Sequence, residues 1–431
     1  MRRVVITGLG VISPLGNTAE SLWAGLEGRR SGVAAVANGH AGLAREFAGV
    51  AHDFTGHIDN FGPLDGELKK SIRKGLKVMC RESQMGVAAA QRALSDAAIA
   101  AGAYDPERVG VVFGSDYMVT DPTEFISAMR AFAPDEKHFE FSRWAGNGMP
   151  QLSPLWLLKY LPNMPASHIA IYNDFRGPNN SLTLREAAAN LAVGEALRVI
   201  QRGHADCMLA GATGTRVHPM KALHAVIQEE IAPNGQLPER ASRPFDLNRS
   251  GMVLGEGAGA IMLEEYNAAR ARGARIYAEL VGAGSSSVVD RNRVARRDQA
   301  LRNAMKSALR DAQMEPAAIG HVNSHGLGTR SGDAEEAAAI HDIFGARKVP
   351  VAAVKSYFGN LGAGSAMVEL AASALALANN RLFPVLNYET PDPECPVAAV
   401  TNPDASPGDS FMKLSVTPQG QAACLIVRRC A

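Results

Sequence analysis

The sequence predicts an α/β protein built from two similar halves, and three observations support this fold class. Apolar runs rich in β-branched residues alternate with alanine-rich amphipathic segments, as buried strands alternate with the helices that cover them. The same order of elements occurs twice along the chain. The 431 residues, 46% of them hydrophobic, are enough to bury a large core. We therefore expect a duplicated βα unit, with halves 1–260 and 261–431 packed sheet to sheet.

The first half contains the first copy of the pattern. A β-branched run opens a strand at 4–8, and a helix is expected over 83–98. A second strand, 109–114, ends in a glycine turn, and an alanine-rich helix covers 184–201.

The second half repeats this order. A strand is expected over 276–284, a helix over 298–312, a strand that ends in a glycine turn over 319–326, and an alanine-rich helix over 364–379. Packing the two sheets face to face would bring helix starts from both halves to one central site.

The segment 115–165 interrupts the first copy. It places Trp144 and Trp156 among short helical pieces and prolines. We interpret it as a cap or an insertion that faces a dimer partner.

The charge balance excludes several classes of partner. Lys and Arg number 44 and Asp and Glu 43, so a formal charge of +1 gives no strong field towards nucleic acid or an anionic membrane.

The cysteines lie far apart without C-x-x-C spacing, so neither a metal site nor a disulfide framework is expected and a reducing cytoplasm fits: Cys80, Cys207, Cys395, Cys424 and Cys430. The apolar run near the N-terminus is interrupted by Gly8, Gly10 and Pro14, which disfavours a signal peptide. No run approaches the ~18 apolar residues that span a bilayer.

The segment 177–190, GPNNSLTLREAAAN, resembles the strand-to-helix turn of the β-ketoacyl-acyl-carrier-protein synthases. That family carries its nucleophilic cysteine nine residues after the glycine, where this chain has Glu186. Gly194 and Gly203 lie at the family's distances from the same position, so a slip in register is not expected. Attack of a carboxylate on a thioester gives a mixed anhydride of higher energy, so Glu186 does not replace the thiolate.

Four further segments carry the resemblance over nearly the whole chain. The opening strand and turn, residues 1–16, are similar to those of ketosynthases, and 243–259, RPFDLNRSGMVLGEGAG, is similar to the loop and strand that join their two halves. The resemblance implies the thiolase-like fold, with two duplicated βα halves in five layers, α-β-α-β-α.

The third segment, 323–333, NSHGLGTRSGD, resembles the family's first catalytic-histidine loop. His325 would donate a hydrogen bond to the thioester carbonyl and the enolate. Leu327 replaces a hydroxyl residue that touches phosphopantetheine, Thr329 retains the second one, and Asp333 is a supporting residue.

The segment 354–364, VKSYFGNLGAG, resembles the second histidine loop, and Asn360 stands where the histidine is expected. An asparagine amide can still donate to a carbonyl, as in the Cys-His-Asn set of the initiating synthases. Lys355 and Glu369 match the family's buried charge pair, which holds the loops.

Active members carry Gly-Phe-Gly-Gly-Thr-Asn before the last strand, and this flexible loop gates the acyl chamber. This chain has TPQGQA at 417–422. Since proline fixes φ, we expect a stiffer loop and the loss of one gating element.

Glu186 has two interpretations. A carboxylate in the first turn stabilises a helix by about 0.3–1 kcal/mol, and Arg185 beside it is a candidate partner. Alternatively, burial raises its pKa towards neutrality, and it exchanges a proton beside His325 and Asn360.

Three functions remain open. The chain is a non-condensing subunit similar to chain-length factors of polyketide or fatty-acid synthesis, or a malonyl-carrier-protein decarboxylase that uses Glu186, His325 and Asn360, or a working synthase with another nucleophile. Cys207 in a strand and Cys80 on an early helix are poor candidates for that nucleophile, because neither is expected at a helix start.

The resemblance implies the same partners in each case. They are an acyl carrier protein with its phosphopantetheine arm and a dimer partner, either a second copy or an active ketosynthase. No other cofactor is expected.

Overall fold

One mixed sheet crosses the computed structural model, which describes residues 1–36, 45–100, 102–132 and 140–430. Its strand order is β11-β10-β9-β12-β13-β8-β1-β7-β6-β4-β5. The first-half strands are β1 (Val4–Ile12), β4 (Val109–Ser115), β5 (Asn179–Thr183), β6 (Cys207–Thr215) and β7 (Glu256–Glu265). The second-half strands are β8 (Ala278–Ser287), β9 (His321–Asn323), β10 (Pro350–Ala352), β11 (Ala398–Ala399), β12 (Ser410–Val416) and β13 (Gln421–Arg428). A small sheet pairs β2 (Ala34–Ala35) with β3 (Phe47–Ala48).

The two halves meet where β1 pairs antiparallel with β8, with Val4 opposite Leu280 and Ile6 opposite Ala278. Each half keeps its own strands on its own side of this contact. The predicted duplicated halves therefore form a continuous sheet that folds over a shared core. The proposed boundary at residue 260 falls inside β7 and stays a prediction.

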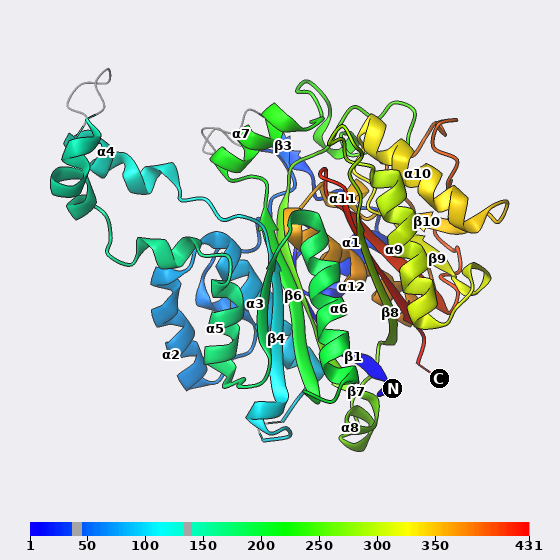
Figure 1. Ribbon diagram of the computed structural model, residues 1–431, viewed down its shortest axis with the longest axis horizontal. Helices are drawn as coiled ribbons and strands as arrows, with labels where there is room; N and C mark the ends of the chain where they lie inside the picture. The colour runs from blue at the N-terminus through cyan, green and yellow to red at the C-terminus, as the bar shows by residue number, and fades with distance from the viewer. Residues whose placement is uncertain (37–44, 101, 133–139, 431) are drawn as a thin grey trace.

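The helices form the other layers, as Figure 1 shows. They are α1 (Ala19–Glu27), α2 (Gly66–Gly75), α3 (Arg81–Ala97), α4 (Ile126–Phe132), α5 (Met164–Asn173), α6 (Ala188–Gln201), α7 (Pro219–Gln228), α8 (Tyr266–Ala271), α9 (Arg297–Ala312), α10 (Arg330–Phe344), α11 (Lys355–Phe358) and α12 (Ser365–Ala378). Helices α6 and α12 contact strands of both halves, α3 packs on β1, β6 and β7, and α9 packs on β8 and β13. This is the predicted α-β-α-β-α arrangement.

The central layer is built from small side chains. Every residue of α12 from Ser365 to Leu377 is buried, and most are alanine, serine or leucine. A Cβ at Gly259 of β7 would lie 2.7 Å from the Cβ of Met367, so only a glycine allows this helix to approach the strand so closely. Small residues therefore allow the central helices, α6 and α12, to begin in the middle of the molecule.

The predicted insertion, residues 115–165, projects from the rest of the molecule as an arm, which Figure 1 shows at the left with α4 in its outer part, the head. The outgoing and returning segments of the arm contact each other where Lys159 Nζ lies 3.1 Å from Glu124 Oε1. In the head, the ring of Phe125 lies 6.3 Å from that of Trp144 and 5.2 Å from that of Trp156. The head thus has an aromatic core of its own, although 133–139 lie outside the described residues.

The predicted elements are present, with two changes that matter for the site. The strand expected over 319–326 is only His321–Asn323, so His325 lies in a loop beyond it. The helix expected from 184 begins as a 3-10 turn, Arg185–Ala187, before α6 starts at Ala188. Within the described ranges, no helix is long and apolar enough to cross a membrane.

Candidate active site

Glu186 lies at the centre of the molecule, in the 3-10 turn between β5 and α6. Arg185 before it has a φ of 49°, a left-handed conformation that side-chain-bearing residues rarely adopt. This turn directs Glu186 inwards, where its side chain is 1% exposed. The sequence therefore builds a sharp strand-to-helix turn that presents one carboxylate to the interior.

The Glu186 carboxylate is paired with a buried guanidinium. Arg216, which directly follows β6 and is also 1% exposed, donates through Nη2 to Glu186 Oε1. Arg185 Nε lies 3.5 Å from Glu186 Oε2. The predicted pairing of Arg185 with Glu186 is confirmed, but Arg216 makes the closer contact.

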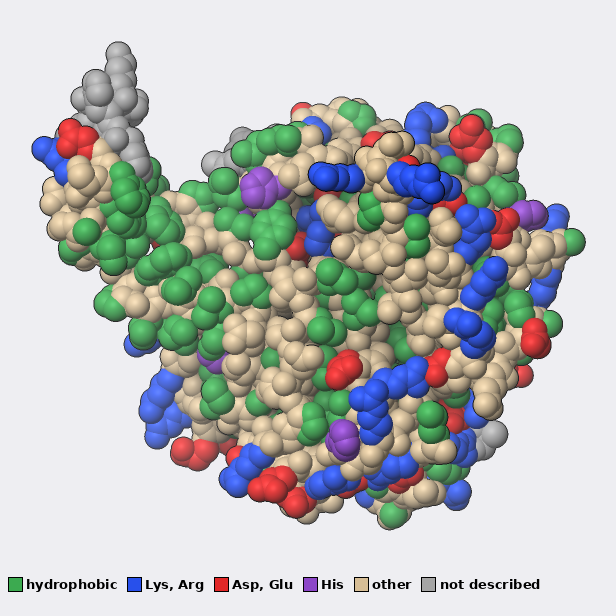
Figure 2. Space-filling model, in the orientation of Figure 1, with side chains coloured by type: hydrophobic (Ala, Val, Ile, Leu, Met, Phe, Trp, Pro, Cys, Tyr) green, Lys and Arg blue, Asp and Glu red, His purple; other side chains and the backbone are tan. Residues whose placement is uncertain are grey.

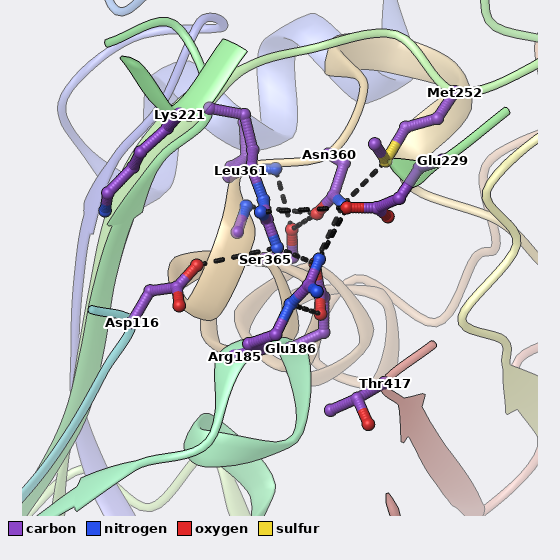
Figure 3. A network of polar contacts seen from close by, with 12 residues as sticks. Asp116, Arg185, Glu186, Lys221, Glu229, Met252, Asn360, Leu361, Ser365 and Thr417 are labelled. Atoms are coloured by element: carbon purple, nitrogen blue, oxygen red, sulfur yellow. Dashed lines mark hydrogen bonds and ion pairs between the residues drawn. The ribbon is translucent and has the colours of Figure 1, made fainter. Parts of the chain in front are cut away.

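Asn360 binds the same carboxylate oxygen. Its Nδ2 donates to Glu186 Oε1 at 3.1 Å and lies 2.9 Å from Met252 Sδ. Its Oδ1 accepts from Gly362 N at 3.0 Å and from Ser365 Oγ at 3.1 Å. Figure 3 shows Asn360, Ser365 and Glu186 converging on this point. Both ends of the Asn360 amide are therefore engaged, and the end that would donate to a substrate carbonyl is bonded to Glu186.

The pKa of Glu186 corrects one interpretation of the sequence. Burial alone would raise this pKa, but the charges of Arg216 and Arg185 outweigh burial and hold it well below its usual range. The hypothesis that burial moves Glu186 towards neutrality is therefore wrong, because the sequence did not reveal the second guanidinium. Glu186 is ionised and is a poor proton donor at neutral pH.

The charge cluster extends towards the arm and α7. Arg216 Nη2 also lies 3.5 Å from Asp116 Oδ2, at the root of the arm. Arg185 Nη2 lies 2.6 Å from Glu229 Oε1, beyond the end of α7. Three carboxylates thus surround two guanidiniums, so the cluster has a net negative charge.

His325 is held by its backbone and one ring nitrogen. Its N–H donates to Glu336 Oε1 at 2.6 Å, and its carbonyl accepts from Lys355 Nζ at 2.7 Å. Lys355 Nζ also lies 3.3 Å from His325 Nδ1. Because an ammonium has only donors, Nδ1 is the acceptor and the ring proton lies on Nε2. Burial, with Lys355 next, lowers the pKa of His325 well below its ordinary value, so the ring is neutral.

The protonated Nε2 of His325 is buried and has no hydrogen-bond partner within the described residues. The Oε2 atom of Glu186 is also buried and has no hydrogen-bond partner among these residues. A neutral imidazole with a free N–H is the donor that carbonyl polarisation requires. His325 thus has a free donor for a carbonyl oxygen, as expected, whereas the donor of Asn360 is bonded to Glu186.

Behind His325, one buried carboxylate is held between two ammonium groups. Glu369 Oε1 lies 2.6 Å from Lys355 Nζ, which confirms the predicted pair. Its Oε2 lies 2.6 Å from Lys413 Nζ, and Lys413 is fully buried in β12. Burial lowers the pKa of Lys413, while Glu369 opposes this shift.

Asp333 holds the loop that follows His325. Its carboxylate accepts from the backbone N–H groups of Leu327 at 3.0 Å and Phe245 at 2.8 Å, and burial raises its pKa to about 7. Thr329 is buried at the start of α10, and its carbonyl accepts from Arg249 Nε at 3.1 Å. Asp333 therefore has the predicted supporting place, whereas the contact of Thr329 with pantetheine stays a prediction.

The space beside His325 is small. A cavity of about 20 Å³ is lined by Arg297, His325, Leu327, Gly332, Asp333, Glu336, Val416, Thr417 and Pro418. This volume is enough for about one water molecule. An acyl chain therefore cannot enter here without movement or without space supplied by a second chain.

The loop expected to be stiff is a tight turn between β12 and β13. Thr417 N donates to Gln421 O at 2.9 Å, and Gly420 N donates back to Thr417 O at 3.0 Å. Gly420 has a φ of 82°, which favours glycine. The structure agrees with a closed turn where active family members have a mobile gate.

The cysteines remain poor nucleophiles, although one expectation about them is wrong. Cys80 is the residue that caps the start of α3, whereas the sequence analysis placed it away from any helix start. Burial and then the charge of Glu82 nevertheless raise its pKa. Burial also raises the pKa of Cys207, the first residue of β6. Neither thiol is poised to ionise.

Among the site residues that the sequence analysis missed, Lys413 and Arg216 are the two basic ones that pair with a predicted carboxylate. Lys413 left a signal, because a lysine inside an apolar strand is unusual and implies a buried partner. Arg216 left a weaker one as an arginine directly after a buried strand. Only the structure shows that both lie in the site.

Comparisons with known proteins agree with this fold. The family model for the β-ketoacyl synthase N-terminal domain matches residues 1–269, and that for the C-terminal domain matches residues 277–389. The chain is 32% identical to 3-oxoacyl-[acyl-carrier-protein] synthase 2 of Synechocystis sp., over 91% of this chain and 90% of that protein. The corresponding Staphylococcus aureus protein is also 32% identical, over 93% of this chain and 92% of its own length.

Solved structures give the same result. A type II polyketide ketosynthase in complex with its acyl carrier protein, AntDE:AntF, superposes over the full length of both chains with a TM-score of 0.84 and 25% identity. The ishigamide ketosynthase/chain length factor superposes over the same extent with a TM-score of 0.82 and 28% identity. The fold and the site define a thiolase-like α/β protein with a ketosynthase-type centre. The chain belongs to the β-ketoacyl synthase family, whose members act in fatty-acid or polyketide biosynthesis.

Proposed function

We propose that this chain is a non-condensing member of its family, a subunit that pairs with an active ketosynthase and shapes the cavity in which the acyl chain grows. The observation that carries the proposal is the buried ion pair of Glu186 and Arg216. It occupies the start of the central helix, where a condensing enzyme needs a reactive thiol.

The site's polar groups support this proposal. Nδ2 of Asn360 is bonded to Glu186, so this donor is not free for a substrate carbonyl. The carboxylate of Glu186 is ionised and held by Arg216 and Arg185. A thioester would have to displace a desolvated ion pair to reach this point, and breaking such a pair is strongly unfavourable.

The arm supports pairing with a second chain. Figure 2 shows hydrophobic side chains over the arm and its head. The large exposed ones are Ile126, Met129, Phe141, Met149, Leu155 and Leu157. A projecting segment with so much apolar surface is typical of a protein interface. The ketosynthase/chain length factor in the comparisons is a relative of this paired kind.

The partners follow from the same proposal. An acyl carrier protein would present the growing chain on its phosphopantetheine arm, and the dimer partner would supply the nucleophile. Thr329, at the start of α10, is the residue proposed to contact the pantetheine.

Decarboxylation of malonyl-carrier-protein is the second candidate. The free Nε2–H of His325 favours it, since this donor can stabilise an enolate. The net negative cluster opposes it, because Asp116, Glu186 and Glu229 would repel the malonyl carboxylate. A third candidate, condensation through another nucleophile, would need a reactive thiol, and burial raises the pKa of both Cys80 and Cys207.

Intact-protein mass spectrometry tests these candidates together. The chain would be incubated with malonyl- and acyl-carrier-protein, alone and with a co-encoded ketosynthase. With the chain alone, we expect no covalent adduct and no loss of carbon dioxide from malonyl-carrier-protein. When the chain joins the ketosynthase, we expect the length of the acyl product to change. Conversion of malonyl to acetyl by the chain alone would establish the decarboxylase, and a stable acyl adduct would establish a hidden nucleophile.

A further inference from the structure

A large cavity opens in the outer helical layer of the first half. It lies between helices α2, α3 and α5, which occupy the left part of Figure 1, and the residues that follow α3. Its volume is about 850 Å³, within the range of roughly 300–1,000 Å³ that is usual for small-molecule sites. The cavity is therefore large enough for a small organic molecule.

The cavity lies at the opposite end of the sheet from the candidate active site. Val109 and Cys207, the first residues of β4 and β6, line it. Arg216 follows the other end of β6, so nearly the length of this strand, on the order of 25 Å, separates the cavity from the ion pair of Glu186 with Arg216. A ligand in the cavity would therefore not touch the candidate active site.

The wall of the cavity is mostly apolar and partly aromatic. Six of its side chains pack against the core of the first half and are only partly buried, so each keeps apolar surface uncovered: Leu64, Leu68, Leu94, Ile99, Tyr172 and Phe175. Tyr104 adds another ring to the wall. Aromatic side chains make favourable stacked or edge contacts with other rings. The wall therefore favours a ligand that contains an apolar ring.

One buried donor in this wall has no partner. Gln91 of α3 lines the cavity and is 4% exposed, and its Nε2 has no hydrogen-bond partner within the described residues. The hydroxyl of Tyr104, by contrast, already donates to Glu264 Oε2. Leaving a buried amide donor unpaired is unfavourable, and a ligand oxygen would satisfy it without further desolvation of the protein. Gln91 therefore selects for a ligand with an acceptor such as a carbonyl oxygen.

The charged side chains around the cavity are acidic. Asp65, Glu67 and Asp174 line it at exposed positions, and no lysine or arginine among the described residues does so. Asp174 is paired with Arg176, whose Nε lies 2.8 Å from Asp174 Oδ1. The remaining negative charge would repel a carboxylate or a phosphate at the entrance. The acceptor that suits Gln91 therefore belongs to an uncharged molecule.

We propose that this cavity is a second ligand site, which binds a neutral, ring-containing molecule whose carbonyl oxygen accepts from Gln91 Nε2. The apolar wall holds the ring, and the single hydrogen bond fixes its orientation. This inference goes beyond the proposed function and does not depend on it, because none of the residues that line the cavity belongs to the cluster around Glu186.

The test is a fluorescence titration of the purified full chain with prodan, a neutral naphthalene that carries a dimethylamino group and a propionyl carbonyl. The second ligand is the analogue that lacks the propionyl group. Gln91→Met keeps a side chain of similar length and removes the donor. The matched control is Gln299→Met, which makes the same change at an exposed position of α9 in the second half.

We expect the parent to bind prodan and Gln91→Met to bind it about fivefold more weakly, the effect of losing one neutral hydrogen bond. The analogue without the carbonyl should bind the parent and Gln91→Met equally, and Gln299→Met should match the parent for both compounds. Equal affinities of the parent and Gln91→Met for prodan, or no binding of prodan by the parent, would overturn the proposal.

Two further measurements locate the probe and test the state of Gln91. Ser95→Trp adds bulk to the wall from an exposed position of α3, so we expect both compounds to bind about tenfold more weakly. Unchanged binding in this variant would place the probe elsewhere and sink the site. Because Gln91 Nε2 is unpaired, Gln91→Met should melt no lower than the parent. A lower melting temperature would mean that Nε2 has a partner inside the chain, and its role as donor to a ligand would be wrong.

Discussion

Arg216 and Glu186 form an ion pair in which both side chains are 1% exposed. The two residues come from different elements of the first half, since Arg216 follows β6 and Glu186 precedes α6. Neither charge is tolerable alone in a dry interior, so each is kept by the other. The centre of this family member is thus occupied by a structural ion pair.

Removing the guanidinium should destabilise the protein strongly. Arg216→Met leaves Glu186 with only Arg185 at 3.5 Å and Asn360 as partners. We expect a loss of about 3–5 kcal/mol, the usual effect of breaking a buried pair. The measurement is urea unfolding of the purified chain. Arg216→Met/Glu186→Gln should recover part of the loss, and a single variant within about 1 kcal/mol of the parent would contradict a tight pair.

Glu186 should also make the stability of the folded protein depend on pH. Its folded-state pKa lies below its unfolded value, so its contribution is present above about pH 4.3 and is lost as the pH falls through the lowered pKa. We expect the thermal midpoint of the parent to exceed that of Glu186→Gln at pH 6 and the difference to shrink towards pH 3. The surface variant Glu67→Gln serves as the control. A difference that is constant across this range would show that Glu186 has the same pKa in the folded and the unfolded chain, which would contradict the lowered pKa.

The sequence was sufficient to predict the fold and the position of Glu186, because these depend on local patterns. Alternating periods predict strands and helices. The register of the turn that carries Glu186 follows from its resemblance to the β-ketoacyl synthases, with Gly194 and Gly203 at the family's distances from that position. The ion pair of Lys355 and Glu369 was predictable from the same resemblance, because both residues match the family's buried charge pair.

The electrostatic state of the site was not predictable. Whether Glu186 is neutral or ionised depends on Arg216, which is 30 residues away in sequence and meets it only through the packing of β6 against α6. Lys413 reaches Glu369 from the far end of the chain in the same way. A pKa is set by neighbours in space, and a single sequence does not reveal them.

The second buried lysine should tune His325. Burial and Lys355 are the larger causes of the low pKa of His325, and Lys413 adds to them. We therefore expect Lys413→Met to raise the pKa of His325 towards its ordinary value, measured by nitrogen-15 NMR of histidine-labelled protein over pH. Lys306→Met on the exposed side of α9 is the matched control. An unchanged titration of His325 in Lys413→Met would remove Lys413 from this role.

The closed turn after β12 should behave as a rigid element. The amides of Thr417 and Gly420 are both engaged in backbone hydrogen bonds, so we expect their hydrogen exchange to be slow in the parent. Gly420→Ala should loosen the turn, because φ is 82° and the new Cβ would lie 2.7 Å from Val288 O. We expect it to destabilise the protein by about 1–2 kcal/mol and to speed exchange at Thr417.

The matched control for this turn is Gly235→Ala, an exposed glycine with a φ of 83° and open space around its Cβ position. It carries the same backbone strain without the clash, so it should destabilise the protein less and leave exchange at Thr417 unchanged. Fast exchange at Thr417 and Gly420 in the parent would mean that this turn opens readily. A gate would then exist here despite Pro418, and the comparison with active family members would have to be revised.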